Sequence, residues 1–249
     1  MTSVVLNEPV RTILLDIEGT TTPLDFVHHV LFPYARSHVR QFLDQQVSSP
    51  NVRADLAALE QESIADAQAG LTPPVRQRDS PQADLESTVA YIQWLMDRDR
   101  KSTALKSLQG KIWEQGYESG QLRGTVFDDV PSALQRWHSQ KRSIAIFSSG
   151  SVLAQRLLFA HTIAGDLTPY LSRYFDTTTG PKTEASSYRT IRRALQQSAS
   201  EIVFISDVAA ELDAAASAGL QVLLCERAGN HPQPSNAHPR IRGFEELLL

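Results

Sequence analysis

The sequence contains very little cysteine: Cys225 is the single cysteine among 249 residues. One cysteine cannot form an internal disulfide, which excludes a disulfide-stabilised secreted domain and fits a reducing compartment. The stretch Met1–Pro9 has neither the basic start nor the long apolar run of a signal peptide. We therefore expect a cytoplasmic protein.

Long hydrophobic runs and clusters of positive charge are also missing. No stretch approaches the roughly 18 apolar residues of a membrane-spanning helix. The net charge is -4, from 24 Lys and Arg against 28 Asp and Glu, and the basic residues form no block. A nucleic-acid-binding surface would be basic and clustered. We expect neither a membrane nor a nucleic acid as partner and, because no coiled-coil pattern is evident, a monomer.

Short apolar runs alternate with helix-like segments along most of the chain. The runs that predict core strands are Thr12–Asp16, Ser143–Ser148, Ile202–Asp207 and Gln221–Cys225, with a shorter one near Tyr174–Thr177. The segments that predict helices are Pro131–Ser139, Val152–Ala160, Glu184–Gln197 and Ala209–Ala218. This alternation predicts an α/β fold with a doubly wound, Rossmann-like parallel sheet.

The rhythm is broken between the first and second predicted strands. Residues 24–125 contain no convincing strand, whereas the apolar residues of 85–96 and 105–113 follow helical spacing. A parallel crossover needs only about a dozen residues. We therefore predict a core formed by residues 1–23 and 125–249, and a helical cap of residues 24–124 inserted after the first strand. A cap in that place would cover the carboxyl end of the sheet and exclude water from a small substrate.

The first strand ends in two acidic residues that precede a Gly- and Thr-rich turn. Asp16 is followed two positions later by Glu18. In open α/β sheets, ligands bind outside the carboxyl ends of the strands. Such a pair suits a nucleophile with an acid/base partner, or two ligands of a divalent cation. The simpler alternative is an ordinary strand-end Asp with a solvated Glu.

Two further segments carry groups that can bind phosphate. Ser148, Ser149 and Gly150 follow the second long strand and precede a helix, whose free N–H groups favour an anion. Ser151 is the expected N-cap of that helix. Lys182 lies in a Gly-Pro loop before another predicted helix and can balance the charges of a carboxylate and a phosphate. Taken singly, each has a structural explanation, such as helix capping or a surface lysine.

Asp207 ends another strand and is followed by Glu211 one helical turn later. Capping explains a single strand-end Asp, but Asp207 coincides with Asp16 at the same edge of the predicted sheet. Mg²⁺ takes one or two carboxylates, several waters and substrate phosphate, so an oxygen-rich site of Asp16, Glu18 and Asp207 would suit it.

The order of these groups resembles the four-motif signature of the haloacid dehalogenase-like phosphatases. Within that superfamily the chain is most similar to the enolase-phosphatases of methionine salvage. The segments that carry this resemblance are Leu14–Pro23, Asp99–Gly110, Ser148–Val152, Phe175–Thr177 and Lys182–Arg189. The broad superfamily pattern has Asp at the second acidic position, where this chain has Glu18.

The resemblance implies a bifunctional Mg²⁺-dependent enzyme with one ion per subunit. It would enolise 2,3-diketo-5-methylthiopentyl-1-phosphate and then hydrolyse the phosphate, giving the acireductone 1,2-dihydroxy-3-keto-5-methylthiopentene. By resemblance, Asp16 is the phosphoryl acceptor and Glu18 the acid/base. Ser148, Ser149 and Lys182 bind the phosphate, and Asp16, Glu18 and Asp207 hold the metal.

Three other functions are compatible with parts of this pattern. A generalist Mg²⁺-dependent phosphatase of the same superfamily would hydrolyse without enolisation. A hydrolytic dehalogenase would need no metal, which the additional acids Glu18 and Asp207 argue against. A non-catalytic phosphate-binding module would bind without turnover.

Overall fold

The computed structural model describes residue 6, residues 9–233 and residues 238–247. Parts of the predicted core range, of the stretch Met1–Pro9 and of the loop predicted at Gly229–Pro239 lie outside these residues. The chain forms two compact units: one joins the residues up to Val27 with those from Leu122 onward, and the other is His28–Gln121. The boundaries between the two units therefore lie a few residues inside the limits of 24 and 124 that were predicted for the cap.

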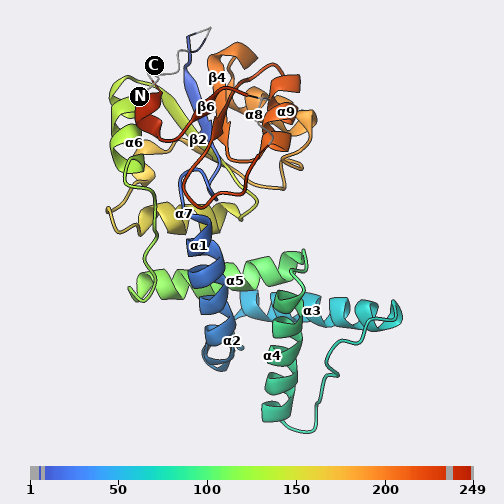
Figure 1. Cartoon of the computed structure of the whole chain (residues 1–249). Coiled ribbons are helices and arrows are strands. Elements are labelled where there is room, and N and C mark those ends of the chain that lie inside the picture. The colour runs from blue at the N-terminus through green and yellow to red at the C-terminus, as the bar shows by residue number, and fades with distance from the viewer. Residues whose placement is uncertain (1–5, 7–8, 234–237, 248–249) are drawn as a thin grey trace. The chain divides into compact units, whose positions relative to one another are not determined.

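The first unit is built on a six-stranded parallel sheet in the order β3-β2-β1-β4-β5-β6. The strands are β1 (Thr12–Leu15), β2 (Ser143–Phe147), β3 (Arg173–Phe175), β4 (Ile202–Ser206), β5 (Gln221–Cys225) and β6 (Arg240–Ile241). Its helices include α6 (Val130–Ser139), α7 (Val152–Ala160), α8 (Ala185–Leu195) and α9 (Ala209–Ser217). Helix α6 lies on one side of the sheet and α8 and α9 lie on the other (Figure 1). The predicted doubly wound α/β fold is confirmed.

The apolar runs predicted the long strands to within one residue at their ends. The last residues assigned to three of these strands, Asp16, Ser148 and Asp207, lie instead just beyond them, whereas the predicted limits of β5 are matched at both ends. The short strand β6 was missed. It pairs with β5 through only two residues, and one of them is Arg240, so it has no apolar run that would mark it.

Strand β1 is the point where the strand order reverses. It lies between β2 and β4, and Leu15 is in register with Ile146 on one side and Ile205 on the other. The residues just beyond these three strands therefore converge at one edge of the sheet. This edge is the topological switch point at which open α/β sheets bind ligands.

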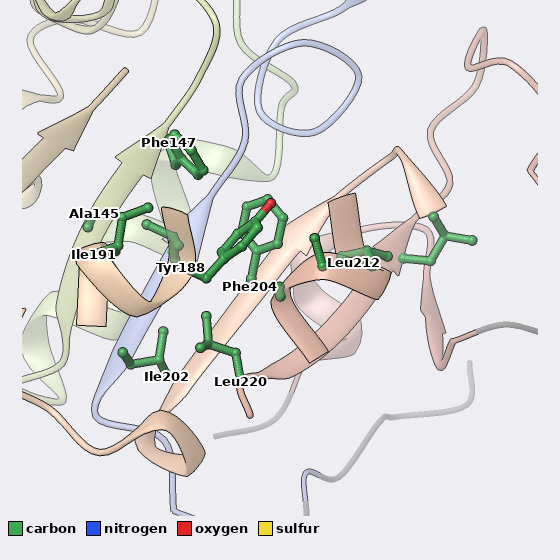
Figure 2. Packing of buried hydrophobic residues seen from close by; sticks show 12 residues of the cluster. Ala145, Phe147, Tyr188, Ile191, Ile202, Phe204, Leu212 and Leu220 are labelled. Carbon is green, nitrogen blue, oxygen red and sulfur yellow. The ribbon is translucent and has the colours of Figure 1, made fainter. Parts of the chain in front are cut away.

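The core beside this edge is packed with large apolar side chains. One cluster joins β1, β2 and β4 to the inner faces of α8 and α9, and Figure 2 shows how its members pack. The Tyr188 ring lies 5.1 Å from that of Phe204 and 5.5 Å from that of Phe147 between centroids. All three side chains are fully buried. The Tyr188 hydroxyl donates to the carbonyl of Lys182 at 2.6 Å, so this packing also fixes the loop that carries the lysine.

The second unit, His28–Gln121, has helices as its regular structure, and all its residues are described. Before it come α1 (Leu24–Phe26) and a π-helical turn (Val27–Leu31) that spans the boundary, and its helices are α2 (Phe32–Gln46), α3 (Pro50–Gln68), α4 (Pro81–Asp97) and α5 (Thr103–Glu118). The spacing that predicted α5 corresponds to its buried face, and the Trp113 indole there donates to the carbonyl of Leu31 at 2.8 Å. In the described part of the chain, each helix is too short or too polar to cross a bilayer.

We predict that Phe204→Ala lowers the free energy of unfolding of the sheet unit by about 3–5 kcal/mol, because it leaves a cavity in a fully buried cluster. Urea denaturation followed by circular dichroism measures the change. Ile163→Ala is the control, since that side chain in the same unit is 76% exposed. A loss for Phe204→Ala no larger than that of the control would contradict this account of the core.

Candidate active site

Asp16 lies directly beyond β1, in a turn held by its own backbone. The Asp16 carboxylate is buried, and its Oδ1 accepts the N–H of Ile17 at 2.7 Å. The three N–H groups of Thr20–Thr22 all point to the carbonyl of Ile17, at 2.9–3.1 Å. Gly19 has φ +69°, a left-handed conformation that is energetically unfavourable for residues with a Cβ. The glycine therefore allows the chain to reverse its direction in this turn.

Lys182 brings the loop before α8 to this carboxylate. Its Nζ lies 2.6 Å from Asp16 Oδ1 and 2.7 Å from Glu211 Oε2, and all three side chains are buried. Burial alone lowers the pKa of the Lys182 ammonium, but the charges of Asp16 and Glu211 outweigh burial and raise the pKa. The lysine is therefore held as a cation between two carboxylates.

Ser206, the last residue of β4, links the two carboxylates a second time. Its Oγ lies 2.9 Å from Glu211 Oε2 and 3.3 Å from Asp16 Oδ2, and it accepts the N–H of Val208 at 3.2 Å. A hydroxyl has one hydrogen, so Ser206 serves one carboxylate at a time. Asp16 Oδ2 is consequently less engaged than Oδ1, which both Lys182 and the Ile17 N–H bind.

The site holds more negative than positive charge. Burial, followed by repulsion from Asp16, raises the pKa of Asp207 to about 7, and the same two causes raise the pKa of Glu211 to about 7. Among the residues that the structure describes, the cation that balances the carboxylates of Asp16, Asp207 and Glu211 is the ammonium of Lys182. The oxygen-rich donor set and the surplus negative charge both fit a bound divalent cation.

Two of the predicted metal ligands besides Asp16 differ in burial. Asp207 is buried and lies next to the turn: a Cβ added to Gly19 would overlap Asp207 Oδ2 and lie 2.6 Å from its Cγ. Glu18 is half-buried in the turn, and its backbone pairs with that of Thr22. Among the described residues, no three His, Cys, Asp or Glu side chains are grouped so as to hold a metal. The assignment of Asp16, Glu18 and Asp207 as ligands therefore stays a prediction.

The Ser-Ser-Gly loop is held by a residue that the sequence did not single out. Ser148 is buried, and its Oγ accepts the N–H of Gly150 at 3.2 Å. The Gln155 amide donates to the carbonyl of Gly150 at 2.8 Å and to that of Phe175 at 2.9 Å. Ser151 caps α7 as predicted, accepting from the N–H of Ala154 at 3.3 Å.

Sequence reasoning missed the contributions of Glu211 and Ser206. The signal was present, because a hydroxyl residue precedes Asp207 and an acid follows it by four positions, one helical turn away. Glu211 was noted only for its position after Asp207, and neither residue was given a role.

A cavity of about 400 Å³ lies at the opposite, amino-terminal end of β2 and β3. His138, Lys141 and Arg142 contribute to its lining, which contains no acidic residue. It is therefore separate from the carboxylate site in both position and charge.

Comparison with known proteins identifies the chain as a hydrolase. The family model for haloacid dehalogenase-like hydrolases matches residues 10–219. An enolase-phosphatase E1 of Synechococcus elongatus is 54% identical over 96% of this chain and 98% of its own length. That of Pseudomonas syringae is 46% identical over 85% and 87%, and that of Drosophila erecta is 43% identical over 88% and 84%.

The crystal structure of the UTR4 protein of Saccharomyces cerevisiae is similar along the whole fold. It is 37% identical to this chain with a TM-score of 0.77, covering 96% of this chain and 100% of the yeast chain. The chain is thus a haloacid dehalogenase-like hydrolase, and more narrowly it belongs to the enolase-phosphatase E1 family.

We predict that Gly19→Ala both strains the turn and displaces Asp207. The left-handed conformation alone costs about 1–2 kcal/mol with a Cβ, and the overlap with Asp207 adds to this. Gly165→Ala is the matched control, because Gly165 also has positive φ but no atom within 4 Å of the added Cβ. Urea denaturation should show the larger loss for Gly19→Ala; equal losses would contradict the contact with Asp207.

Proposed function

We propose that the chain enolises 2,3-diketo-5-methylthiopentyl-1-phosphate and then hydrolyses its phosphate, releasing an acireductone. Similarity to enolase-phosphatases over nearly the whole chain supports the substrate and the two activities. The observation that supports the chemistry best is the buried Asp16 carboxylate, which Lys182 orients from 2.6 Å at the switch point of the sheet.

Asp16 is the proposed phosphoryl acceptor. Its less engaged oxygen, Oδ2, attacks phosphorus, the bond between phosphorus and the substrate oxygen breaks, and an aspartyl-phosphate forms. Water then attacks this phosphorus, releases inorganic phosphate and regenerates the carboxylate. Glu18 is the proposed acid that protonates the leaving oxygen, and afterwards the base that takes a proton from the water.

The phosphoryl group carries negative charge that the site must balance. Lys182 is already held as a cation beside Asp16 and is proposed to bind the phosphoryl oxygens, with Ser148 and the Ser149 backbone. Asp16, Asp207 and Glu18, the last through its side chain or its carbonyl, would hold one Mg²⁺. When bound, the ion would supply charge neutralisation at the phosphoryl oxygens and polarisation of the substrate carbonyl.

The helical insertion is proposed as a cap over the substrate, with limits at residues 24 and 124. We also propose that the enzyme is a cytoplasmic monomer whose partner is the small phosphorylated substrate. The single buried thiol of Cys225 is consistent with a reducing compartment. Light scattering should give a mass near 27.6 kDa.

Asp16→Asn should lower phosphate release by roughly 10⁴-fold, because an amide cannot act as the nucleophile. The measurement is phosphate release from the diketone phosphate, with circular dichroism to confirm that the fold persists. Asp213→Asn, an exposed acid on α9, is the control that should keep normal turnover. Near-full turnover by folded Asp16→Asn would refute the assignment.

The diketone phosphate supplied anaerobically should give an ultraviolet-absorbing enol before phosphate appears. Both signals should require Mg²⁺, and stopped-flow absorbance with a coupled phosphate assay measures their order. Phosphate release from a range of phosphate esters, with no enol on any time scale, would instead identify a generalist phosphatase.

A further inference from the structure

The turn after Asp16 is also held from outside, by side chains that follow β5. The Asn230 Nδ2 donates to the carbonyl of Gly19 at 2.9 Å, and the Arg227 Nε donates to the carbonyl of Thr20 at 3.2 Å. These donors lie more than 200 residues from the turn along the chain. Two successive carbonyls of the turn are thus fixed by two side chains of one segment.

Arg227 is itself rigidly placed. Its guanidinium lies over two aromatic rings, 4.5 Å from the centroid of Phe127 and 4.7 Å from that of Phe244. It pairs with Asp129 at 2.9 Å, and the Arg227 side chain is only 6% exposed. Stacking and ion pairing leave the planar fork few alternative positions. A hydrogen bond from such a group fixes the position of its acceptor.

Asn230 spans the gap between the turn and the sheet. Its Nδ2 donates to the carbonyl of Cys225, the last residue of β5, at 3.2 Å as well as to that of Gly19. Its Oδ1 lies 3.1 Å from the position of a Cβ on Gly19, the same space that borders the carboxylate of Asp207. The amide therefore ties the turn to the end of the sheet and lies beside Asp207 without adding a negative charge.

We propose that Asn230, supported by Arg227, is a positioning residue for phosphoryl transfer. It fixes the turn that carries Asp16 and Glu18 relative to Asp207, and so sets the spacing of the proposed metal ligands. Asn230 acts through the turn and not on the reacting atoms. The catalytic consequence of this inference rests on the proposed function, but the hydrogen bonds that hold the turn do not depend on it.

The test compares wild type, Asn230→Ala and the exposed neighbour control His231→Ala. Hydrogen exchange of the peptide amides at 17–22, measured on metal-free protein, should be faster in Asn230→Ala and unchanged in His231→Ala. Isothermal titration with Mg²⁺ should show about a 10–100-fold weaker Kd, as for other groups that orient metal ligands. We expect kcat to fall by a similar factor with little change in KM or in the unfolding midpoint.

Asn230→Leu separates hydrogen bonding from side-chain size. Leucine is similar in size and uncharged but lacks the amide donor, so its turn should exchange as fast as that of Asn230→Ala. Wild-type exchange in either variant, or an unchanged Mg²⁺ Kd in Asn230→Ala, would overturn the inference. If the wild-type chain neither binds Mg²⁺ nor releases phosphate, the proposed function fails, and the exchange measurement still decides whether Asn230 holds the turn.

Discussion

The Lys182 ammonium, buried between Asp16 and Glu211, is the interaction on which the site depends. Without that cation, three buried carboxylates would face one another, and a buried charge without a partner is costly. The lysine also connects separate parts of the chain, because Asp16 follows β1 while Glu211 belongs to α9. The packing of Tyr188 against Phe204 helps to hold Lys182 in place, because the Tyr188 hydroxyl donates to the carbonyl of Lys182 itself. Core packing and site electrostatics therefore meet at one residue.

The same arrangement leaves the site with an excess of negative charge. One ammonium cannot neutralise three carboxylates, and burial together with repulsion from Asp16 raises the pKa values of Asp207 and Glu211. A cation or a proton completes the balance, and a bound phosphate would add further negative charge that a cation can offset. The excess negative charge is thus a property that suits the site to a metal-assisted reaction with an anionic substrate.

The sequence predicted the elements whose signal is local. Strands β1, β2, β4 and β5 are continuous apolar runs because both faces of a parallel sheet are buried, whereas β6 has only two residues and was missed. Asp16 and Asp207 were predicted as site residues because strand ends are recognisable. Asn230 was not, because its partner is a backbone carbonyl, which leaves no pattern in the sequence of a residue more than 200 positions away. Glu211 was noted one helical turn after Asp207, but its pairing with Lys182 depends on a loop from another part of the chain and was not predicted.

The contact between Asn230 and Gly19 also bears on the order of synthesis. The turn is synthesised more than 200 residues before the side chains that fix it. Strand β1 must likewise wait for β2 and β4, which follow the entire helical unit. Contacts of such long sequence separation form late. A nascent chain therefore carries Asp16 through the synthesis of more than 200 further residues without a finished site around it, and the site is completed only after the segment that follows β5 has emerged.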